Sequence, residues 1–244
     1  MDASNKPDAP DGRWRALLDT ELAVVVRGLW DGSVGHTVRC VPTRRTVAVE
    51  HGGGHVFGKW RVRGGNAASE EWHWLHLLPL LGIRTAEPIV WIGNRRRNLL
   101  VTAGVAGRPL DAWALEAHRA GWLFELVAYA CRDVARAVRR LHDQGLVYRD
   151  LYWNHLFAGD PRVAAEAPVF LDCERVMRPR WRWRRWVVKD LASLWASVPV
   201  PVGRRAVLRF LRSYLGEPLV EHRPLLVAIA AKAARIRRHV PRYG

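Results

Sequence analysis

The chain is short of cysteine and of long apolar runs, and each shortage excludes a class of protein. Its 244 residues include three cysteines, an odd number without CxxC spacing, which argues against a disulfide framework or a zinc site. The longest nearly continuous apolar run, Trp122 to Cys131, has about ten residues, whereas spanning a bilayer takes roughly 20. The polar first 12 residues lack the apolar core of a signal peptide. We therefore expect a disordered tail over 1–12, no membrane-spanning helix and a cytoplasmic location.

Acidic residues are also scarce. The chain has 39 Lys and Arg against 23 Asp and Glu, a formal net charge of +16. From Arg178 to the end there are 16 basic residues and three acidic ones, so most of the excess is C-terminal. The electrostatic field of such a positive region attracts polyanions, for example nucleic acid, an anionic membrane surface or a phosphorylated glycolipid. The alternative is that the charge only forms a solvated basic surface with no binding role. The chain has no helix-turn-helix or zinc-finger spacing, so we expect no specific nucleic acid partner.

What the chain does contain is a candidate catalytic loop, LVYRDLYWNHLF, at 146–157. In protein-kinase-like enzymes the loop reads HRDxxxxN, where the Asp orients the attacking hydroxyl and accepts its proton, and the Asn binds Mg²⁺. Here Arg149, Asp150 and His155 stand in a YRDxxxxH pattern. Downstream, the apolar run VFLD ends in Asp172, where such a fold places its main metal-binding carboxylate. The pattern predicts phosphoryl transfer if the upstream parts match.

One upstream part is a lysine in a chain that has few of them. With 35 Arg and four Lys, a position that needs only positive charge would usually be Arg, so Lys59 indicates a compact point charge, although a chance surface lysine is the alternative. Glu71 follows 12 residues later in a helical pattern and is placed to pair with Lys59. Glu70 is the competing candidate, and Ser69 is a possible N-cap of that helix.

Short β-branched runs around Lys59 predict a small sheet. The HGGGH run at 51–55 lies too close to Lys59 for a phosphate-binding glycine loop and predicts a turn between two strands. Any nucleotide loop would then be at 42–45, with Arg44 and Arg45 in place of glycine. The segment AGVAGRPLDAW at 103–113 is the expected hinge. The predicted strands are His36–Val41, Thr46–Glu50, Val56–Val62, Pro88–Ile92 and Leu99–Thr102.

Helical patterns dominate the rest. The segment 13–29 has mixed periodicity, which fits a helix that leads into a strand, and little weight is given to this interpretation. A long amphipathic helix is predicted from Trp122 to Gly145, which would be its C′ glycine. Asp190, in the helical pattern VVKDLASLWASV, is either a buried acid that anchors the catalytic-loop backbone or an ordinary acid matched to the helix dipole. Closing helices are predicted at 204–215 and 224–240.

In this order the parts resemble the lipopolysaccharide core kinase family, the Kdo and heptose kinases of the WaaP type, over roughly residues 36–200. EEWHWLHLLPLLGIRTAEPI, YRDLYWNHLF, LDCERV and KDLASLWASV are similar to four segments of that family. The Asp-x4-His form of the loop looks more like the heptose-kinase branch than like Kdo kinases, which have Asn there. Tyr148 replaces the loop histidine, and we expect it to fill the same packing site.

The resemblance implies an α+β, bilobal protein-kinase-like fold, with a β-rich N-lobe of one antiparallel sheet and one helix at 13–103 and a mainly helical C-lobe at 104–244. It implies ATP and Mg²⁺ as cofactors. Lys59 would hold the α- and β-phosphates, Glu71 would position Lys59, and Asp172 and His155 would bind metal. Asp150 would orient the acceptor hydroxyl and receive its proton, and Arg149 would support the loop.

The resemblance also implies an acceptor, a heptose or Kdo of the lipopolysaccharide inner core, reached at the cytoplasmic face of the inner membrane. A protein or small-molecule kinase of the same fold and a non-catalytic, polyanion-binding pseudokinase are the alternatives. The Arg/Trp-rich run at 178–186 occupies the position of an activation segment, where it would contact an anionic glycolipid or a lipid surface, or would pack into the core beneath a solvated arginine face. Its candidate contact residues are Arg180, Trp181, Arg182, Trp183, Arg184 and Arg185.

Overall fold

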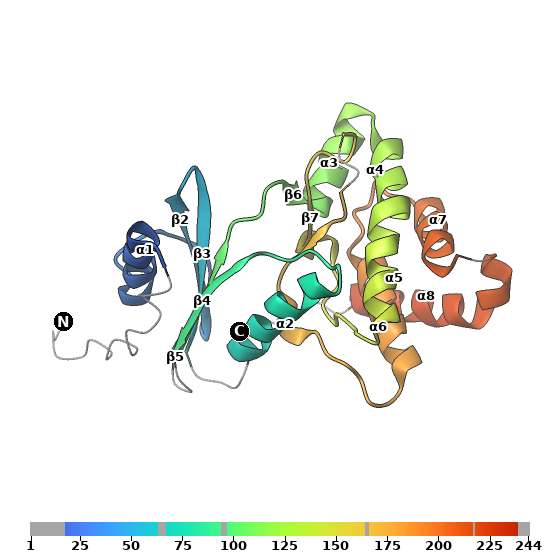
Figure 1. Cartoon of the computed structure of the whole chain (residues 1–244). Coiled ribbons are helices and arrows are strands. Elements are labelled where there is room, and N and C mark those ends of the chain that lie inside the picture. Colours follow the sequence, from blue (N-terminus) through green and yellow to red (C-terminus); the bar gives the residue numbers. More distant parts are fainter. Residues whose placement is uncertain (1–17, 63–66, 94–96, 164–165, 217, 239–244) are drawn as a thin grey trace. The chain divides into compact units, whose positions relative to one another are not determined.

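The computed structural model describes residues 18–62, 67–93, 97–163, 166–216 and 218–238. The predicted tail at 1–12 and the last predicted helical residues, 239 and 240, lie outside this part. The chain divides into two compact units: unit 1 takes in the residues up to 76 and those from 86 to 105, and unit 2 takes in 77–85 and everything from 106 onward. Unit 1 contains an antiparallel sheet, and unit 2 is mainly helical (Figure 1).

The sheet of unit 1 has five antiparallel strands in the order β1-β2-β3-β5-β4. All five predicted strands are present. The β2–β3 hairpin turns at Gly52 and Gly53, whose φ angles of 59° and 76° suit glycine, so the HGGGH run is the predicted turn. The strands are β1 (His36–Val41), β2 (Arg44–His51), β3 (Gly54–Val62), β4 (Pro88–Gly93) and β5 (Arg97–Ala103).

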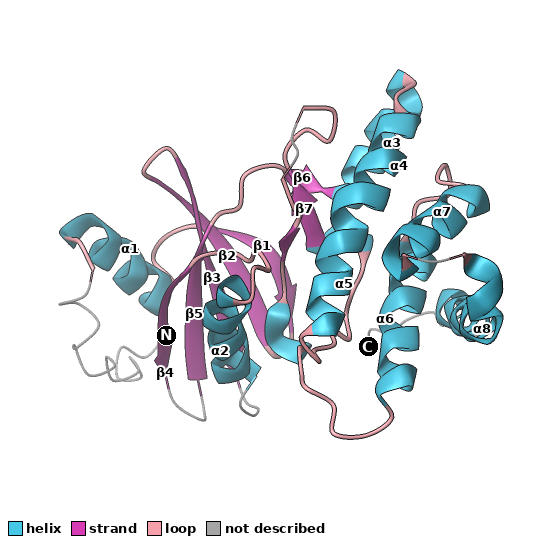
Figure 2. Ribbon diagram, turned by 45° about the vertical axis from the view of Figure 1, so that its right-hand side comes forward, coloured by secondary structure: helices cyan, strands magenta, loops and turns pink. Residues whose placement is uncertain are grey.

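The segment 13–29, weakly interpreted as a helix that leads into a strand, contributes to helix α1 (Thr20–Asp31), and the first strand begins only at His36. It begins at Asp19, whose side chain accepts a hydrogen bond of 2.8 Å from the Leu22 amide, a regular N-cap. Its apolar side packs against one face of the sheet in a core that includes Leu29, Trp30 and Trp60. Figure 2 shows α1 beside the magenta strands of this sheet.

Helix α2 (Ala67–Leu80) starts two residues before Ser69. Ser69 therefore lies inside the first turn, and its predicted role as N-cap is wrong. The chain crosses from unit 1 to unit 2 within this helix, between His76 and Leu77.

The predicted long helix of unit 2 is present in three joined pieces: α4 (Leu123–Tyr129), a π-helical turn (Ala130–Val134) and α5 (Ala135–Asp143). Its end confirms the predicted C′ glycine. Gly145 has a φ of 72°, its amide donates to the His142 carbonyl (2.9 Å), and the Leu146 amide donates to the Leu141 carbonyl (3.2 Å). These two bonds form a Schellman motif, which turns the chain directly into the candidate catalytic loop.

The expected hinge segment is partly helical, which corrects the sequence analysis. Helix α3 (Leu110–Ala120) begins after Pro109 and buries Trp113, Ala114 and Ala117, so the Gly- and Pro-rich connector ends earlier than predicted. Proline is compatible with the start of a helix because the first amides there need no intrahelical acceptor. The remaining helices are α6 (Trp183–Ser197), α7 (Arg204–Leu215) and α8 (Arg223–Arg238).

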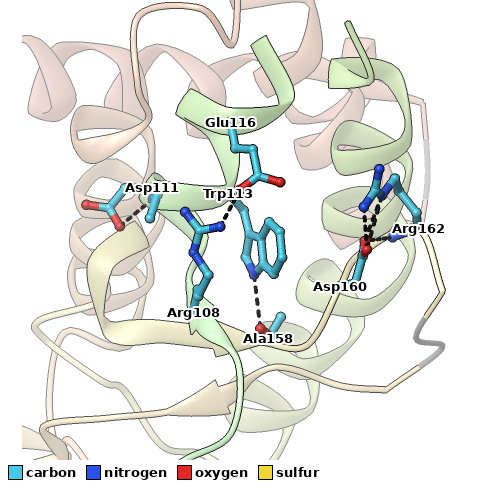
Figure 3. A network of polar contacts seen from close by, with 8 residues as sticks. Arg108, Asp111, Trp113, Glu116, Ala158, Asp160 and Arg162 are labelled. Atoms are coloured by element: carbon cyan, nitrogen blue, oxygen red, sulfur yellow. Dashed lines mark hydrogen bonds and ion pairs between the residues drawn. The ribbon is translucent and has the colours of Figure 1, made fainter. Parts of the chain in front are cut away.

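A second small sheet, in the order β6-β7-β8, joins the catalytic loop to the helices of unit 2. It contains β6 (Arg108–Pro109), β7 (Leu156–Ala158) and β8 (Val169–Phe170). Trp113 of α3 donates to the Ala158 carbonyl at 3.0 Å (Figure 3). Arg108 pairs with Glu116 and lies over the Trp113 ring. These contacts fix β7, and thereby the exit of the catalytic loop, against α3.

No helix in the described part of the chain is long and apolar enough to cross a bilayer.

Candidate active site

The backbone of the catalytic loop is held by Asp190 of α6. Its carboxylate accepts hydrogen bonds from the amides of Tyr148 (2.6 Å) and Arg149 (2.7 Å). Asp190 is fully buried and lies beyond the first turn of α6, so the alternative of an acid matched to the helix dipole is wrong. The anchoring role that the sequence suggested is confirmed.

The anchor holds the loop in an uncommon conformation. Arg149 has a φ of 71°, which costs energy for a residue with a Cβ and persists only where the surroundings enforce it. Here two consecutive amides point at one carboxylate. Tyr148, fully buried, donates its hydroxyl to the Leu171 carbonyl (2.6 Å) and packs against Phe170. Tyr148 is therefore a packing residue, as predicted.

A histidine and a tyrosine that the sequence analysis did not single out extend this anchor. The ring of buried His142 has Nδ1 2.7 Å from the Tyr214 hydroxyl and Nε2 3.3 Å from Asp190 Oδ2. Burial raises the pKa of Tyr214 well above its ordinary value. The hydroxyl therefore stays protonated and donates a hydrogen bond to His142 Nδ1. The Nε2–H of His142 then donates to Asp190, which links α5 and α7 to the loop. Because the three residues are far apart in sequence, only the fold could reveal the link.

Replacing Asp190 with Asn should destabilise the protein. An amide keeps one acceptor oxygen but presents an NH₂ donor to a buried backbone N–H, and an unsatisfied buried group costs about 1–3 kcal/mol. Chemical denaturation should show a loss of that size in the free energy of unfolding, together with reduced turnover. Asp143→Asn is the control, because its carboxylate pairs with Arg139 on the surface and such pairs contribute about 0–1 kcal/mol. Equal effects of the two substitutions would contradict the anchoring role.

The side chain of Asp150 lies among cations. Arg175 Nη1 is 2.9 Å from Asp150 Oδ1 and 3.1 Å from Oδ2. Lys189 of α6 donates to the Arg149 carbonyl and lies 3.8 Å from Asp150 Oδ1. Burial lowers the pKa of Lys189, and the charge of Asp150 opposes that shift. Neither Arg175 nor Lys189 was predicted from the sequence, because their approach to Asp150 depends on how α6 and the chain after β8 pack.

The candidate metal residues lie around the end of β8. Asp172, with a φ of 65°, precedes the short helical turn Cys173–Arg175, and its carboxylate oxygens come within 4.8 Å of those of Glu174. His155 directs Nδ1 to the Asp150 carbonyl (2.9 Å), which leaves Nε2 as its ligand atom. Two carboxylates within reach of one ion fit Mg²⁺, which prefers oxygen ligands. Glu174 was not predicted from the sequence, although the Asp-x-Glu spacing of LDCER is visible there.

In unit 1, the predicted ion pair between Lys59 of β3 and Glu71 of α2 is present. Glu71 is buried, whereas Glu70 is exposed, so Glu70 is not the partner. Arg61 Nη2 lies 3.5 Å from the second oxygen of Glu71, a contact that the sequence analysis missed. The pair holds a partly exposed ammonium on the side of the sheet opposite α1, because its neighbour Trp60 points into the α1 core.

The strand register separates the two arginines that were predicted to replace a glycine loop. Arg44 pairs with Arg61, and Arg45 pairs with Trp60. Because directly paired residues share a face, Arg44 lies on the face of Lys59 and Arg45 lies on the face of α1. Arg45 instead donates to Thr37 Oγ1 at 2.8 Å. The structure therefore brings only Arg44 to the Lys59 face.

The Arg/Trp run is half loop and half helix, because α6 starts at Trp183, earlier than predicted. Trp181 is 80% exposed, so it does not pack into the core, and Trp183 is partly exposed with its edge against His142. All five arginines of this run are exposed, and they include the four named above as candidate contact residues: Arg180, Arg182, Arg184 and Arg185. We call these four arginines and Trp181 the Arg/Trp surface.

A five-stranded antiparallel sheet with a Lys–Glu ion pair, followed by a helical unit whose buried Asp anchors a YRD loop, defines a phosphotransferase of the protein-kinase-like class. The family model described as "Lipopolysaccharide kinase (Kdo/WaaP) family" matches residues 44–214, and the chain belongs to this family. The expected α+β kinase-like fold is thereby confirmed.

Two solved structures are similar to this chain. One, described as "WaaP in complex with acyl carrier protein", is 27% identical, with a TM-score of 0.66 over 83% of this chain and 89% of that chain. The other, an aminoglycoside-3'-phosphotransferase of type VIII, is 19% identical, with a TM-score of 0.58 over 88% of this chain and 99% of that chain, and shows the fold alone. None of the curated proteins compared with this chain matches it.

Proposed function

We propose that the protein is an ATP-dependent kinase that phosphorylates a sugar hydroxyl of the lipopolysaccharide inner core, on a heptose or on Kdo. The observation that carries the proposal is the catalytic loop, in which buried Asp190 holds two consecutive amides and thereby fixes the position of Asp150. Membership of the lipopolysaccharide kinase family supports the acceptor class.

Phosphoryl transfer requires mainly the positioning of the reactants and the stabilisation of charge, and different residues of the site have these roles. Lys59 neutralises the nucleotide phosphates, and Glu71 keeps its ammonium in place. Arg44 adds positive charge on the same face of the sheet. Asp150 accepts a hydrogen bond from the acceptor hydroxyl and takes its proton as the new bond forms. Arg149 supports the loop through the amide that Asp190 holds.

Asp172, Glu174 and His155 are the residues that would hold Mg²⁺. When bound, the ion supplies charge neutralisation for the transferred phosphoryl group. Glu174 extends the set predicted from sequence, and its carboxylate is better suited to this ion than the imidazole of His155.

The Arg/Trp surface is proposed to meet the acceptor or the anionic lipid around it on the cytoplasmic side of the inner membrane. Four exposed arginines next to an exposed tryptophan combine attraction to anions with an amphipathic ring that partitions into a lipid interface. The proposed partners are therefore ATP and an anionic glycolipid.

A comparison of acceptors tests the proposed function. Purified protein with ATP and Mg²⁺ would be given core glycolipid, an aminoglycoside or a generic protein substrate, and ADP formation would be followed. We expect turnover to depend on the glycolipid. Turnover with the aminoglycoside or the protein alone would replace the proposed acceptor, and the absence of turnover with all three would favour a non-catalytic, polyanion-binding role.

Neutralising the four arginines of the Arg/Trp surface with Gln should weaken binding to anionic vesicles and raise the acceptor KM, with little change in the KM for ATP. Each basic residue near an anionic surface contributes about 1 kcal/mol, so vesicle partitioning should fall by orders of magnitude at low salt and much less at high salt. Sedimentation with vesicles at two salt concentrations measures the effect.

The control removes the same charge from exposed positions on α3, α5 and α7. Its four substitutions to Gln are at Arg119, Arg136, Arg205 and Arg209. If this variant loses vesicle binding equally, the attraction is a property of net charge, and the Arg/Trp surface has no special role.

A further inference from the structure

The carboxylate of Asp150 forms an ion pair with Arg175, and this pair affects which acceptor can bind. One nitrogen of Arg175 donates to both oxygens of Asp150, at 2.9 and 3.1 Å. These are the oxygens to which an acceptor hydroxyl must donate before its proton is transferred. In the structure, the group that should receive the substrate thus has a guanidinium bound to it.

The ion pair between Arg175 and Asp150 can be broken at low energetic cost. The side chain of Arg175 is 43% exposed, whereas that of Asp150 is 17% exposed. Solvent-exposed ion pairs are weak, because water competes for both partners and long side chains lose freedom on pairing. A ligand that carries a negative charge can therefore replace Asp150 as the partner of Arg175 with only a small loss of free energy.

The surroundings favour a further anion. Besides Arg175, the side chain of Arg149 and the ammonium of Lys189 face this region, and burial lowers the pKa of both. The second carboxylate nearby, Asp190, is occupied by the two loop amides. Arg175, Lys189 and Arg149 thus place three cations around the Asp150 carboxylate.

One donor in this group has no protein acceptor. Within the described chain, Arg149 Nε is buried and has no hydrogen-bond partner. Its guanidinium lies over the Trp186 ring, with 5.4 Å between Cζ and the ring centroid. A buried donor without an acceptor is costly unless a ligand supplies one, and the left-handed backbone of Arg149 shows that the surroundings enforce its position.

We infer that Arg175 determines acceptor specificity: it leaves Asp150 to bind an anionic group, a carboxylate or a phosphate, carried by the acceptor beside the hydroxyl that is phosphorylated. Arg149 and Lys189 supply the positive field in which that group sits. The exchange frees the Asp150 oxygens for the hydroxyl, so a sugar acid or sugar phosphate is accepted and a neutral sugar is not. This inference rests on the proposed function and specifies the chemistry of its acceptor.

Three forms of one core glycolipid test the inference: the intact molecule, the same molecule with its sugar carboxyl reduced to an alcohol, and the same molecule after dephosphorylation. The wild-type kcat/KM should fall about 10- to 100-fold for the form that lacks the required anion, the scale of a hydrogen bond to a charged group. Which form is the poor acceptor shows whether the anion is the carboxylate or a phosphate.

The variants are Arg175→Ala and Arg175→Lys, with Arg136→Ala on the exposed side of α5 as the control. Arg175→Ala should reduce kcat/KM for the intact acceptor by a similar factor and then show no further loss on the form without the anion, because both changes remove one interaction. Arg175→Lys should keep part of the preference for the acceptor that carries the anionic group, because lysine keeps the positive charge but lacks the planar guanidinium. Arg136→Ala should behave as the wild type.

The ratio of kcat/KM between two acceptors is measured within each variant, so a partly unfolded sample does not change it. Equal wild-type rates on all three forms would overturn the inference and leave the proposed function standing. A loss in Arg175→Ala by the same factor on every form would also overturn it and assign Arg175 to positioning Asp150. If the wild type phosphorylates no form, the proposed function fails and the inference fails with it.

Discussion

Asp172→Asn should abolish phosphoryl transfer and leave the fold intact. The substitution removes a carboxylate from the proposed metal site, and a bound metal contributes several kcal/mol of charge stabilisation, so a loss of about 10³-fold or more in turnover is expected. Asn is a mild change for the backbone, because Asp172 has a φ of 65° and Asn tolerates that region. ADP formation measured across a Mg²⁺ titration checks the result.

Two further substitutions accompany this experiment, one in the proposed metal site and one as a control. Glu174→Gln should raise the Mg²⁺ concentration needed for half-maximal turnover, because it removes the second carboxylate of the pair. Glu221→Gln, at an exposed position before α8, should change neither turnover nor the Mg²⁺ requirement. Full activity of Asp172→Asn with an unchanged Mg²⁺ dependence would exclude Asp172 as the metal ligand.

Lys59→Arg should reduce turnover by about 10²-fold or more, the scale of losing one preorganised charge-stabilising group. Charge is preserved, but a planar guanidinium cannot take the place of a compact ammonium held by a buried carboxylate. Arg61 already lies beside the other oxygen of Glu71, so a second guanidinium would compete for the same partner. Steady-state kinetics with ATP as the varied substrate measure the effect.

The chain offers a matched control, because Lys232 on α8 is another of its four lysines. Lys232→Arg should be indistinguishable from the wild type. If Lys59→Arg is nearly wild type while Arg44→Gln is inactive, the phosphate-binding cation has been misassigned within the sheet.

The features predicted correctly from the sequence have local causes. Two glycines with positive φ produce the β2–β3 turn. The Schellman end of α5 depends on Gly145 and its nearest neighbours. The Lys59–Glu71 pair joins a strand and the next helix, across a short connection. In each case the residue types within a short window decide the local conformation.

The features that were missed depend on register, small residues or distant packing. Arg45 was misplaced because the face of a strand residue depends on its register with the neighbouring strand, which pairs Arg45 with Trp60 and Arg44 with Arg61. Helix α3 was overlooked because two of its buried positions are alanines, Ala114 and Ala117, which give a weak apolar pattern. The His142–Tyr214 contact joins positions 72 residues apart, and no local pattern predicts it.

Asp150, fixed by the Asp190 anchor, is proposed to direct an acceptor sugar hydroxyl toward ATP. The most direct measurement is mass spectrometry of core glycolipid incubated with ATP, Mg²⁺ and either wild-type protein or Asp150→Ala, with the phosphorylated sugar located by fragmentation. The account predicts one added phosphoryl group on a heptose or Kdo with the wild type and none with Asp150→Ala. Unmodified glycolipid with active wild-type protein, or equal phosphorylation by Asp150→Ala, would contradict it.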